Sequence, residues 1–150
     1  MTTAQTGAPV RELTFGELYA RVQNFYAHHM HLLDSGAAAE WAETFTEDGV
    51  FAPPSAPEPI VGRQALAAGA REAKARLDGI GEQHRHVLVS LDLTPNDDGS
   101  LTTRTYAQII ATPRGGEPRL FLMCVTYDHL VFEAGELRVH HRRVTRDDRP

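Results

Sequence analysis

Hydrophobic residues between positions 14 and 34 recur every three to four residues, which is the period of an amphipathic helix. The apolar stripe is formed by Leu18, Val22, Phe25, His29 and Leu32. Thr14 and Glu17 have the spacing of a capping box, so we expect the helix to begin beside them. Gly36 suits the left-handed position that closes a helix, which predicts an end near Asp34.

Two more helices are predicted downstream of this one. Residues 37–45 are rich in alanine and place Trp41 and Phe45 four positions apart, so the two rings can pack along one face of a short helix. Residues 53–59 contain four prolines and are expected to form a loop. Residues 62–77 then repeat alanine and leucine at helical spacing, which predicts the third helix.

The period changes from helical to strand-like at residue 84. Alternating segments separated by turns predict four strands, at residues 84–93, 101–111, 119–132 and 137–145. A turn at residues 47–49 leads into an earlier strand at Val50, and residues 60–61 are also extended. Consecutive strands with short turns form an antiparallel meander. The expected fold is therefore α+β: a curved antiparallel sheet, shaped as a cone-like half barrel, that is covered by about three N-terminal helices and encloses a pocket.

Length and composition suit one soluble domain. A chain of 150 residues can enclose a single core, so we expect one domain across residues 1–150, with a frayed N-terminus at residues 1–12. That N-terminus lacks the apolar run of a signal peptide, and no stretch of the sequence is apolar enough for a membrane span. The single cysteine, Cys124, excludes an intrachain disulfide, and we expect a cytoplasmic protein.

Charge narrows the classes of partner. The chain has 15 lysines and arginines against 20 aspartates and glutamates, which gives a net charge of −5. Nucleic acid and anionic membranes need a basic face, so neither is an expected partner. Among the eight histidines, those that lie on strands able to converge are His84, His86, His140 and His141. The sequence has neither an H-E-x-x-H motif nor a cysteine–histidine spacing, so we expect no metal and no cofactor.

Four segments of the chain resemble the SnoaL-like branch of the nuclear-transport-factor-two-like superfamily. They are LLDSGAAAEWAETFTEDGVF, PIVGRQALAAG, RHVLVSLDL and YDHLVFEAGELRVHHRRV, and the resemblance extends from about Leu13 to Val144. This branch includes scytalone dehydratase-like and lindane dehydrochlorinase-like enzymes, polyketide cyclases and ketosteroid isomerase-like enzymes. The superfamily also contains binding proteins and scaffold subunits, so the fold alone does not decide the function.

The resemblance implies two alternative acid–base sites. In dehydratase-like and dehydrochlorinase-like members, an aspartate at the end of the first helix pairs with a histidine on a central strand, and the matching residues are Asp34 and His86. In SnoaL-type cyclases the aspartate lies seven residues before the glycine of the last hairpin, a position that Asp128 occupies. The dehydratase-like pattern often has an asparagine soon after the strand histidine. Residues 87–90 contain none, and Ser90 is the available hydrogen-bond donor.

The pairing of Asp34 with His86 is chemically reasonable. Imidazole has a pKa of about 6.5 and can remove a proton next to a carbonyl, while a buried carboxylate holds the ring in one tautomer. The structural alternatives are an aspartate that caps its own helix end and a strand histidine bonded to a neighbour. A carboxylate at a helix C-terminus faces the negative end of the helix dipole, which favours a functional reason for Asp34.

Strict alternation does not by itself direct His86 inward. It places His84, His86, Leu88 and Ser90 on one face of the strand, and Val87, Val89, Leu91 and Leu93 on the other. The second face is the more apolar. Members of this superfamily commonly dimerise through the outer face of the sheet, so we expect a homodimer to which this apolar face could contribute.

Four further residues are candidate substrate contacts. Tyr26 could polarise a substrate carbonyl or pack in the core. His29 lies on the helical stripe, either as a satisfied core histidine or as a pocket histidine. Asp128 shares a mostly apolar strand face, where it could line a pocket or pair with an arginine of the last strand. Alternation places His141 with the apolar residues of the last strand, and so toward the interior.

Together these features predict a cofactor-independent lyase or isomerase that acts on a small hydrophobic ring compound, such as a polyketide intermediate. The reaction would be a dehydration, a cyclisation or a double-bond isomerisation. His86 would be the base and general acid, and Asp34 would orient it. The alternatives are a polyketide cyclase that uses Asp128, and a non-catalytic small-molecule-binding or scaffold protein of the same fold.

Overall fold

The computed structural model describes residues 12–54 and 56–150, so the expected fraying of residues 1–12 falls almost wholly outside the described part. The helices are α1 (Phe15–Ser35), α2 (Ala38–Glu43) and α3 (Arg63–Ile80). The strands are β1 (Phe45–Ala52), β2 (Ile60–Val61), β3 (Glu82–Pro95), β4 (Leu101–Pro113), β5 (Arg119–Glu133) and β6 (Glu136–Arg146).

The first helix is capped at both ends as predicted. The Thr14 side chain accepts a hydrogen bond from the Glu17 N–H (3.1 Å), and the Glu17 carboxylate accepts one from the Thr14 N–H (2.9 Å). Gly36 ends the helix in the left-handed conformation with φ 85°, where a side chain would be strained. The buried residues of α1 are Leu18, Val22, Tyr26, His29 and Met30. The Gly36 cap fixes where α1 ends, and this places Asp34 in its last turn.

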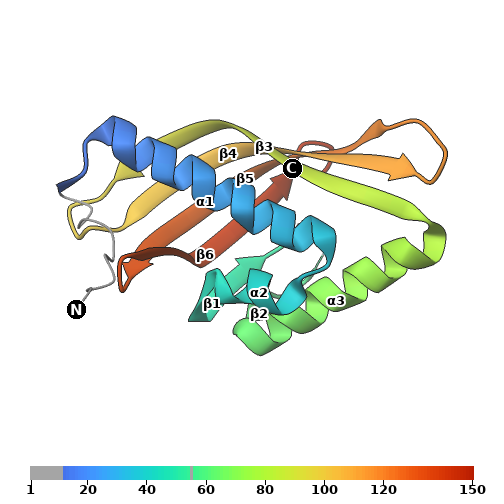
Figure 1. Ribbon diagram of the computed structural model, residues 1–150, viewed down its shortest axis with the longest axis horizontal. Coiled ribbons are helices and arrows are strands. Elements are labelled where there is room, and N and C mark those ends of the chain that lie inside the picture. Colours follow the sequence, from blue (N-terminus) through green and yellow to red (C-terminus); the bar gives the residue numbers. More distant parts are fainter. Residues whose placement is uncertain (1–11, 55) are drawn as a thin grey trace, which may run out of the picture.

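The six strands form one sheet in the order β2-β1-β6-β5-β4-β3. Strands β3 to β6 form the predicted antiparallel meander, whereas β1 pairs parallel to β6, a pairing that the sequence did not reveal. Figure 1 shows α1 lying across the sheet, with α2 and α3 near the end of that helix. The predicted α+β class is confirmed, and β3 is left at the edge of the sheet.

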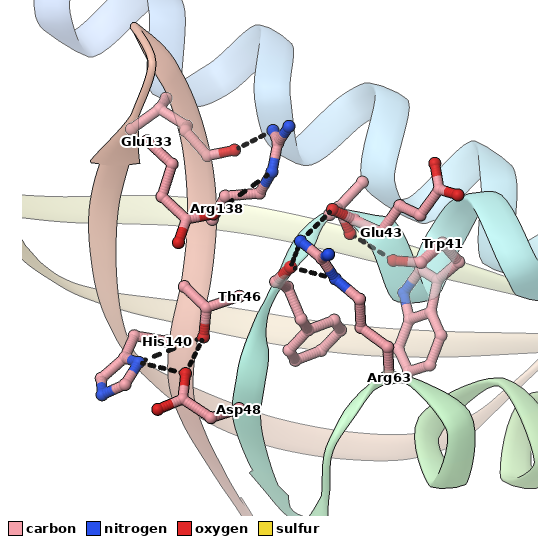
Figure 2. Close-up of polar contacts among 11 residues, drawn as sticks. Trp41, Glu43, Thr46, Asp48, Arg63, Glu133, Arg138 and His140 are labelled. Atoms are coloured by element: carbon pink, nitrogen blue, oxygen red, sulfur yellow. Dashed lines mark hydrogen bonds and ion pairs between the residues drawn. The ribbon is translucent and has the colours of Figure 1, made fainter.

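The core lies between the helices and the sheet. Its fully buried members include Val22, Phe45, Leu66, Leu101, Leu130 and Val139. Arg63, the first residue of α3, adds a polar anchor at the side of this core. Its guanidinium donates to the Phe45 carbonyl from Nε (3.0 Å) and Nη2 (2.7 Å), and Figure 2 shows it reaching the backbone next to Glu43. This contact fixes α3 against the junction of α2 and β1.

The turn predicted at residues 47–49 lies inside β1 instead. The pairing of β1 with β6 shifts register between Phe45 and Val50, so these residues form an irregularity within the strand rather than a break before it. Gly49 is needed there because a Cβ would come within 2.9 Å of the Phe45 Cβ. The rings of Trp41 and Phe45 do pack, with centroids 5.0 Å apart, although Phe45 belongs to the strand and not to the helix.

A β-bulge in β3 overturns the simple alternation expected for that strand. The register with β4 shifts between Val89 and Asp92, and Ser90 adopts φ 57°. The extra residue moves Leu91 onto the same face as His86, so both point toward the helices. The apolar face expected from the sequence is therefore divided: Leu91 and Leu93 are buried in the core, while Val87 and Val89 lie on the outer face.

Candidate active site

Asp34 and His86 meet at the edge of the sheet. Asp34 Oδ1 lies 2.6 Å from His86 Nδ1, and Asp34 Oδ2 accepts a hydrogen bond from the His86 backbone N–H at 2.9 Å. The Asp34 side chain is 7% exposed and the His86 side chain 25%. Because a carboxylate only accepts, Nδ1 carries the ring proton, and in the neutral ring Nε2 keeps a free lone pair.

The fold explains why a carboxylate is tolerated at the C-terminal end of α1. The helix dipole disfavours a negative charge there, and two N–H donors from His86 compensate for it. The backbone donor is free because β3 is an edge strand and this N–H points away from β4. Gln83 adds a second link, since its side-chain amide donates to the Asp34 carbonyl (3.2 Å) and to the His84 carbonyl (2.8 Å).

The His86 side chain is only partly buried, with 25% of its surface exposed. Within the described chain, no protein group hydrogen-bonds to Nε2. The inner-face residues on either side of it along β3, His84 and Leu88, are mostly but not fully buried, whereas Leu91 beyond the bulge is buried. Opposite them on β4 stand the small side chains of Ala107 and Ala111. The dyad is therefore held by two hydrogen bonds on one side, while Nε2 on the other side of the ring has no protein partner in the described residues.

Asp128 is fully engaged in a buried ion pair. Arg142 donates from Nε to Oδ1 and from Nη2 to Oδ2, both at 2.8 Å, and the Tyr26 hydroxyl donates to Oδ2 at 2.7 Å. The Asp128 side chain is 0% exposed and that of Arg142 is 3% exposed. Burial, followed by the charge of Asp128, raises the pKa of Tyr26 well above its ordinary value, so this phenol stays protonated. The Tyr26 oxygen also lies 2.5 Å from the Thr103 hydroxyl, so the Tyr26 hydroxyl donates one hydrogen bond, to Asp128, and accepts another, from Thr103.

His29 is the next link of the same buried network. Arg142 Nη1 lies 2.8 Å from His29 Nε2, and since arginine only donates, Nε2 must be the acceptor. His29 Nδ1 therefore carries the proton and donates to the Thr44 hydroxyl at 2.5 Å, which in turn donates to the Trp41 carbonyl. Burial is the main cause that lowers the pKa of His29 well below its ordinary value, and the charge of Arg142 adds to it. Of the two alternatives left open by the sequence, the geometry corresponds to a satisfied, neutral core histidine.

Two sequence-based placements are wrong. His141 was expected to point inward, but it is exposed on the outer face. The reason is a bulge at His140, because the register of β6 with β5 shifts between the pairs formed by His129 and Leu130. This shift turns Arg142 inward in place of His141. Ser90 is exposed at the β3 bulge and so does not replace the missing asparagine beside His86.

Arg142 is the important residue that pattern analysis did not select. The sequence did indicate that Asp128 could pair with an arginine of the last strand, but not which arginine. Strict alternation nevertheless favoured His141, and only the register between β5 and β6 shows which residue faces inward.

Two open hollows lie elsewhere on the molecule. One hollow, of about 400 Å³, lies on the outer face of the sheet, and Tyr127 and Arg143 are among the residues that line it. The other, of about 440 Å³, lies beside Glu82 where α3 approaches the β4–β5 turn. Among residues 12–54 and 56–150, no group of three or more metal-ligating side chains gathers closely enough to hold a metal ion. Within the same ranges, no helix combines the length and apolarity needed to cross a membrane.

Comparison with known proteins gives the family. The pattern of the SnoaL-like domain matches residues 16–143. The structure of Aln2 from a Streptomyces species is 34% identical with a TM-score of 0.83, covering 91% of this chain and 95% of that one. The structure of ActVI-ORFA from Streptomyces coelicolor is 33% identical with a TM-score of 0.80, covering 87% and 98%. A protein from Catenulispora acidiphila in complex with S-DNPA is 33% identical with a TM-score of 0.79, covering 89% and 96%.

No protein with a curated description is significantly similar to the chain. The matched SnoaL-like domain nevertheless spans most of the length of the chain, from residue 16 to residue 143. The chain therefore belongs to the SnoaL-like family.

Proposed function

We propose that this protein is a cofactor-independent acid–base enzyme, a lyase or isomerase that acts on a small hydrophobic ring compound such as a polyketide intermediate. One observation carries the proposal. The Asp34 carboxylate holds the His86 ring through Nδ1 at 2.6 Å, so Nε2, which has no protein partner in the described residues, is the basic nitrogen. A carboxylate that only capped its helix would not also fix the tautomer of a half-buried histidine on another element.

The proposed chemistry needs only proton transfers. His86 Nε2 removes a proton from a substrate carbon next to a carbonyl, and Asp34 stabilises the imidazolium that forms. In a dehydration, the electrons of the broken C–H bond form the new double bond, the C–O bond breaks, and the departing hydroxyl leaves as water with a proton from the imidazolium. In an isomerisation, the proton returns to another carbon. In a cyclisation, the carbanion equivalent attacks a second carbonyl carbon, the π electrons of that carbonyl move to its oxygen, and the oxygen takes the proton from the imidazolium.

The relatives support a small-molecule substrate. The Catenulispora acidiphila protein, 33% identical to this chain, holds S-DNPA in its structure. Aln2 and ActVI-ORFA share the fold over nearly their whole length at similar identity. We infer that the accessible face of His86 meets a ligand of comparable size.

The lone cysteine, Cys124, is unpaired and buried, which fits the proposed work in a reducing cytoplasm.

The geometry does not favour Asp128 as the base. Both of its oxygens accept hydrogen bonds from charged or phenolic donors, and its side chain has no access to solvent. A base needs a free lone pair within reach of the substrate. We therefore assign Asp128, Tyr26 and His29 to the network that stabilises the interior rather than to substrate contact.

Proton abstraction can be tested without knowing the natural substrate. The probe is 1-tetralone, a bicyclic ketone whose CH₂ group next to the carbonyl exchanges with D₂O, and the exchange is followed by ¹H NMR. The wild-type protein should accelerate the exchange, His86→Gln should lose about 10²-fold or more of that rate, and His31→Gln, which alters an exposed histidine of α1, should not change it. Equal rates for the wild type and His86→Gln would refute the enzyme assignment. Binding of S-DNPA without any exchange would instead indicate a binding protein.

We also propose that the protein forms a homodimer through the outer face of the sheet. Val87 and Val89 are each 37% exposed there, and Tyr106, which pairs with Val89, is 47% exposed. Val87 and Val89 belong to the face expected from the sequence, whereas Leu91 and Leu93, expected beside them, are buried in the core. Sedimentation at micromolar concentration should give a dimer for the wild type and a monomer for Val89→Lys. A monomeric wild type would contradict the proposal.

A further inference from the structure

A second carboxylate–histidine pair lies beside the dyad on the same strand. His84 Nε2 is 2.9 Å from Glu82 Oε1, and both side chains are mostly buried. His84 and His86 are two residues apart before the bulge, so both belong to the inner face of β3, with Cα atoms roughly 7 Å apart. The sheet register agrees, because His84 faces Ala111 of β4 and His86 faces Ile109, two positions before it.

The surroundings fix this pair in place. Glu82 is also contacted by the Arg119 guanidinium of β5 at 3.3 Å. The hydrogen bond from His84 and the charge of Arg119 lower the pKa of Glu82, so it remains a carboxylate. The His84 ring packs against Phe121, with centroids 5.1 Å apart. An anchored carboxylate therefore holds a histidine ring in one orientation, as Asp34 does for His86.

The two histidines are held by opposite nitrogens. Asp34 binds Nδ1 of His86 and leaves Nε2, whereas Glu82 binds Nε2 of His84 and leaves Nδ1 without a protein partner in the described chain. The Phe121 side chain next to His84 is 47% exposed, although it is aromatic. A flat apolar ligand that reaches His86 can rest on this ring and lie alongside His84.

We propose that His84 is a second catalytic proton-transfer group of the same site, with Glu82 and Arg119 as its positioning residues. This inference rests on the proposed function. His86 takes the proton from the substrate carbon, and His84, as the imidazolium, gives its Nδ1 proton to the carbonyl oxygen or to the departing hydroxyl. In enolisation the C–H electrons form the C=C bond and the carbonyl π electrons take the proton from His84. The two histidines then exchange protons with solvent and return to their starting states.

Separate acid and base groups give a bell-shaped dependence of rate on pH, because one histidine must be neutral and the other protonated. The charged and titratable groups around His84 are Glu82 and His86 on β3, Arg119 on β5, Asp34 on α1, and Lys74 and Asp78 of α3, which line the hollow beside Glu82.

The experiment is the pD profile of 1-tetralone exchange for the wild type, His84→Gln, Glu82→Gln and His86→Gln. The wild-type profile should be bell-shaped, and His84→Gln should lower the maximum by about 10²-fold and lose the alkaline decline. Glu82→Gln should lower the maximum and keep the bell shape, because His84 remains but loses the carboxylate that positions its ring. His31→Gln is the matched control and should reproduce the wild type.

The outcomes separate this inference from the proposed function. If His86→Gln is inactive while His84→Gln keeps the wild-type rate and bell shape, the role of His84 is refuted and the dyad stands. If both variants exchange as fast as the wild type, or the wild type does not exchange, both proposals are refuted. A purely structural role for His84 would lower the thermal stability without changing the shape of the profile, and this result too would overturn the inference.

Discussion

Replacing Asp34 with asparagine tests two roles of this residue separately: its support of the fold and its control of the His86 ring proton. The carboxylate accepts from two donors of one residue, the backbone N–H and the Nδ1–H of His86. Asparagine is nearly identical in shape but has only one oxygen. If that oxygen accepts from the backbone N–H, the amide NH₂ faces Nδ1 and forces the proton to Nε2, where the base should be. The opposite orientation leaves two N–H groups facing each other.

The size of the effect follows from these contacts. A hydrogen bond to a charged group contributes about 1.5–3 kcal/mol, and a lost general base costs about 10²–10⁴-fold in rate. We expect Asp34→Asn to lower the 1-tetralone exchange rate by about 10³-fold, within that range. Its free energy of unfolding should fall by only about 1–2 kcal/mol, because at least one of the two contacts is kept.

Three measurements check this prediction. Exchange kinetics give the rate, chemical unfolding gives the stability, and ¹⁵N NMR of the histidine side chains shows whether the His86 proton has moved from Nδ1 to Nε2. Asp48→Asn is the control, since the Asp48 side chain is 80% exposed, and it should leave all three unchanged. An Asp34→Asn protein that exchanges within twofold of the wild-type rate would refute the reasoning.

The remaining predictions concern the buried network. Arg142→Met should lower the free energy of unfolding by about 3–5 kcal/mol, because it leaves the Asp128 charge buried and unpaired; adding Asp128→Leu should recover part of the loss, and urea unfolding of the two variants checks both values. A double variant no more stable than Arg142→Met would contradict the pairing. Stability should also depend on His29: since burial lowers the pKa of this histidine, the unfolded chain takes up a proton near pH 6.5 that the folded chain does not. The contribution of neutral His29 to the free energy of unfolding should therefore be fully present above about pH 6.5. Below that pH, the free energy of unfolding should fall by at most about 1.4 kcal/mol per pH unit until the pH reaches the lowered pKa of His29. Urea unfolding from pH 8 to pH 5 should show a shallower slope for His29→Gln than for the wild type, and equal slopes would refute this assignment.

Local signals in the sequence were sufficient for most elements. The capping box at Thr14 and the glycine at position 36 define α1 because they act through neighbouring atoms. The four long strands follow from alternation and turns in the same way. The α3 helix runs three residues beyond the predicted Leu77 to Ile80, where Gly81 ends it. Each of these features depends only on residues close in sequence.

Features that depend on distant partners were not predictable from the pattern. The parallel pairing of β1 with β6 joins segments about 90 residues apart and leaves no local mark. The bulges at Ser90 and His140 reverse the alternation of β3 and β6, and a bulge is set by the register with the neighbouring strand. This is why alternation favours His141 in place of Arg142. Asp34 and His86 came from the family resemblance, and the geometry brings them together.

The central claim is that the substrate meets His86 on the inner face of the sheet. A crystal structure with S-DNPA, the ligand held by the Catenulispora acidiphila relative, tests it most directly. We expect the ligand within hydrogen-bond distance of His86 Nε2, with its ring system alongside His84 and Phe121. A ligand seated instead in the outer-face hollow beside Tyr127 and Arg143, with Nε2 of His86 facing solvent, would contradict it.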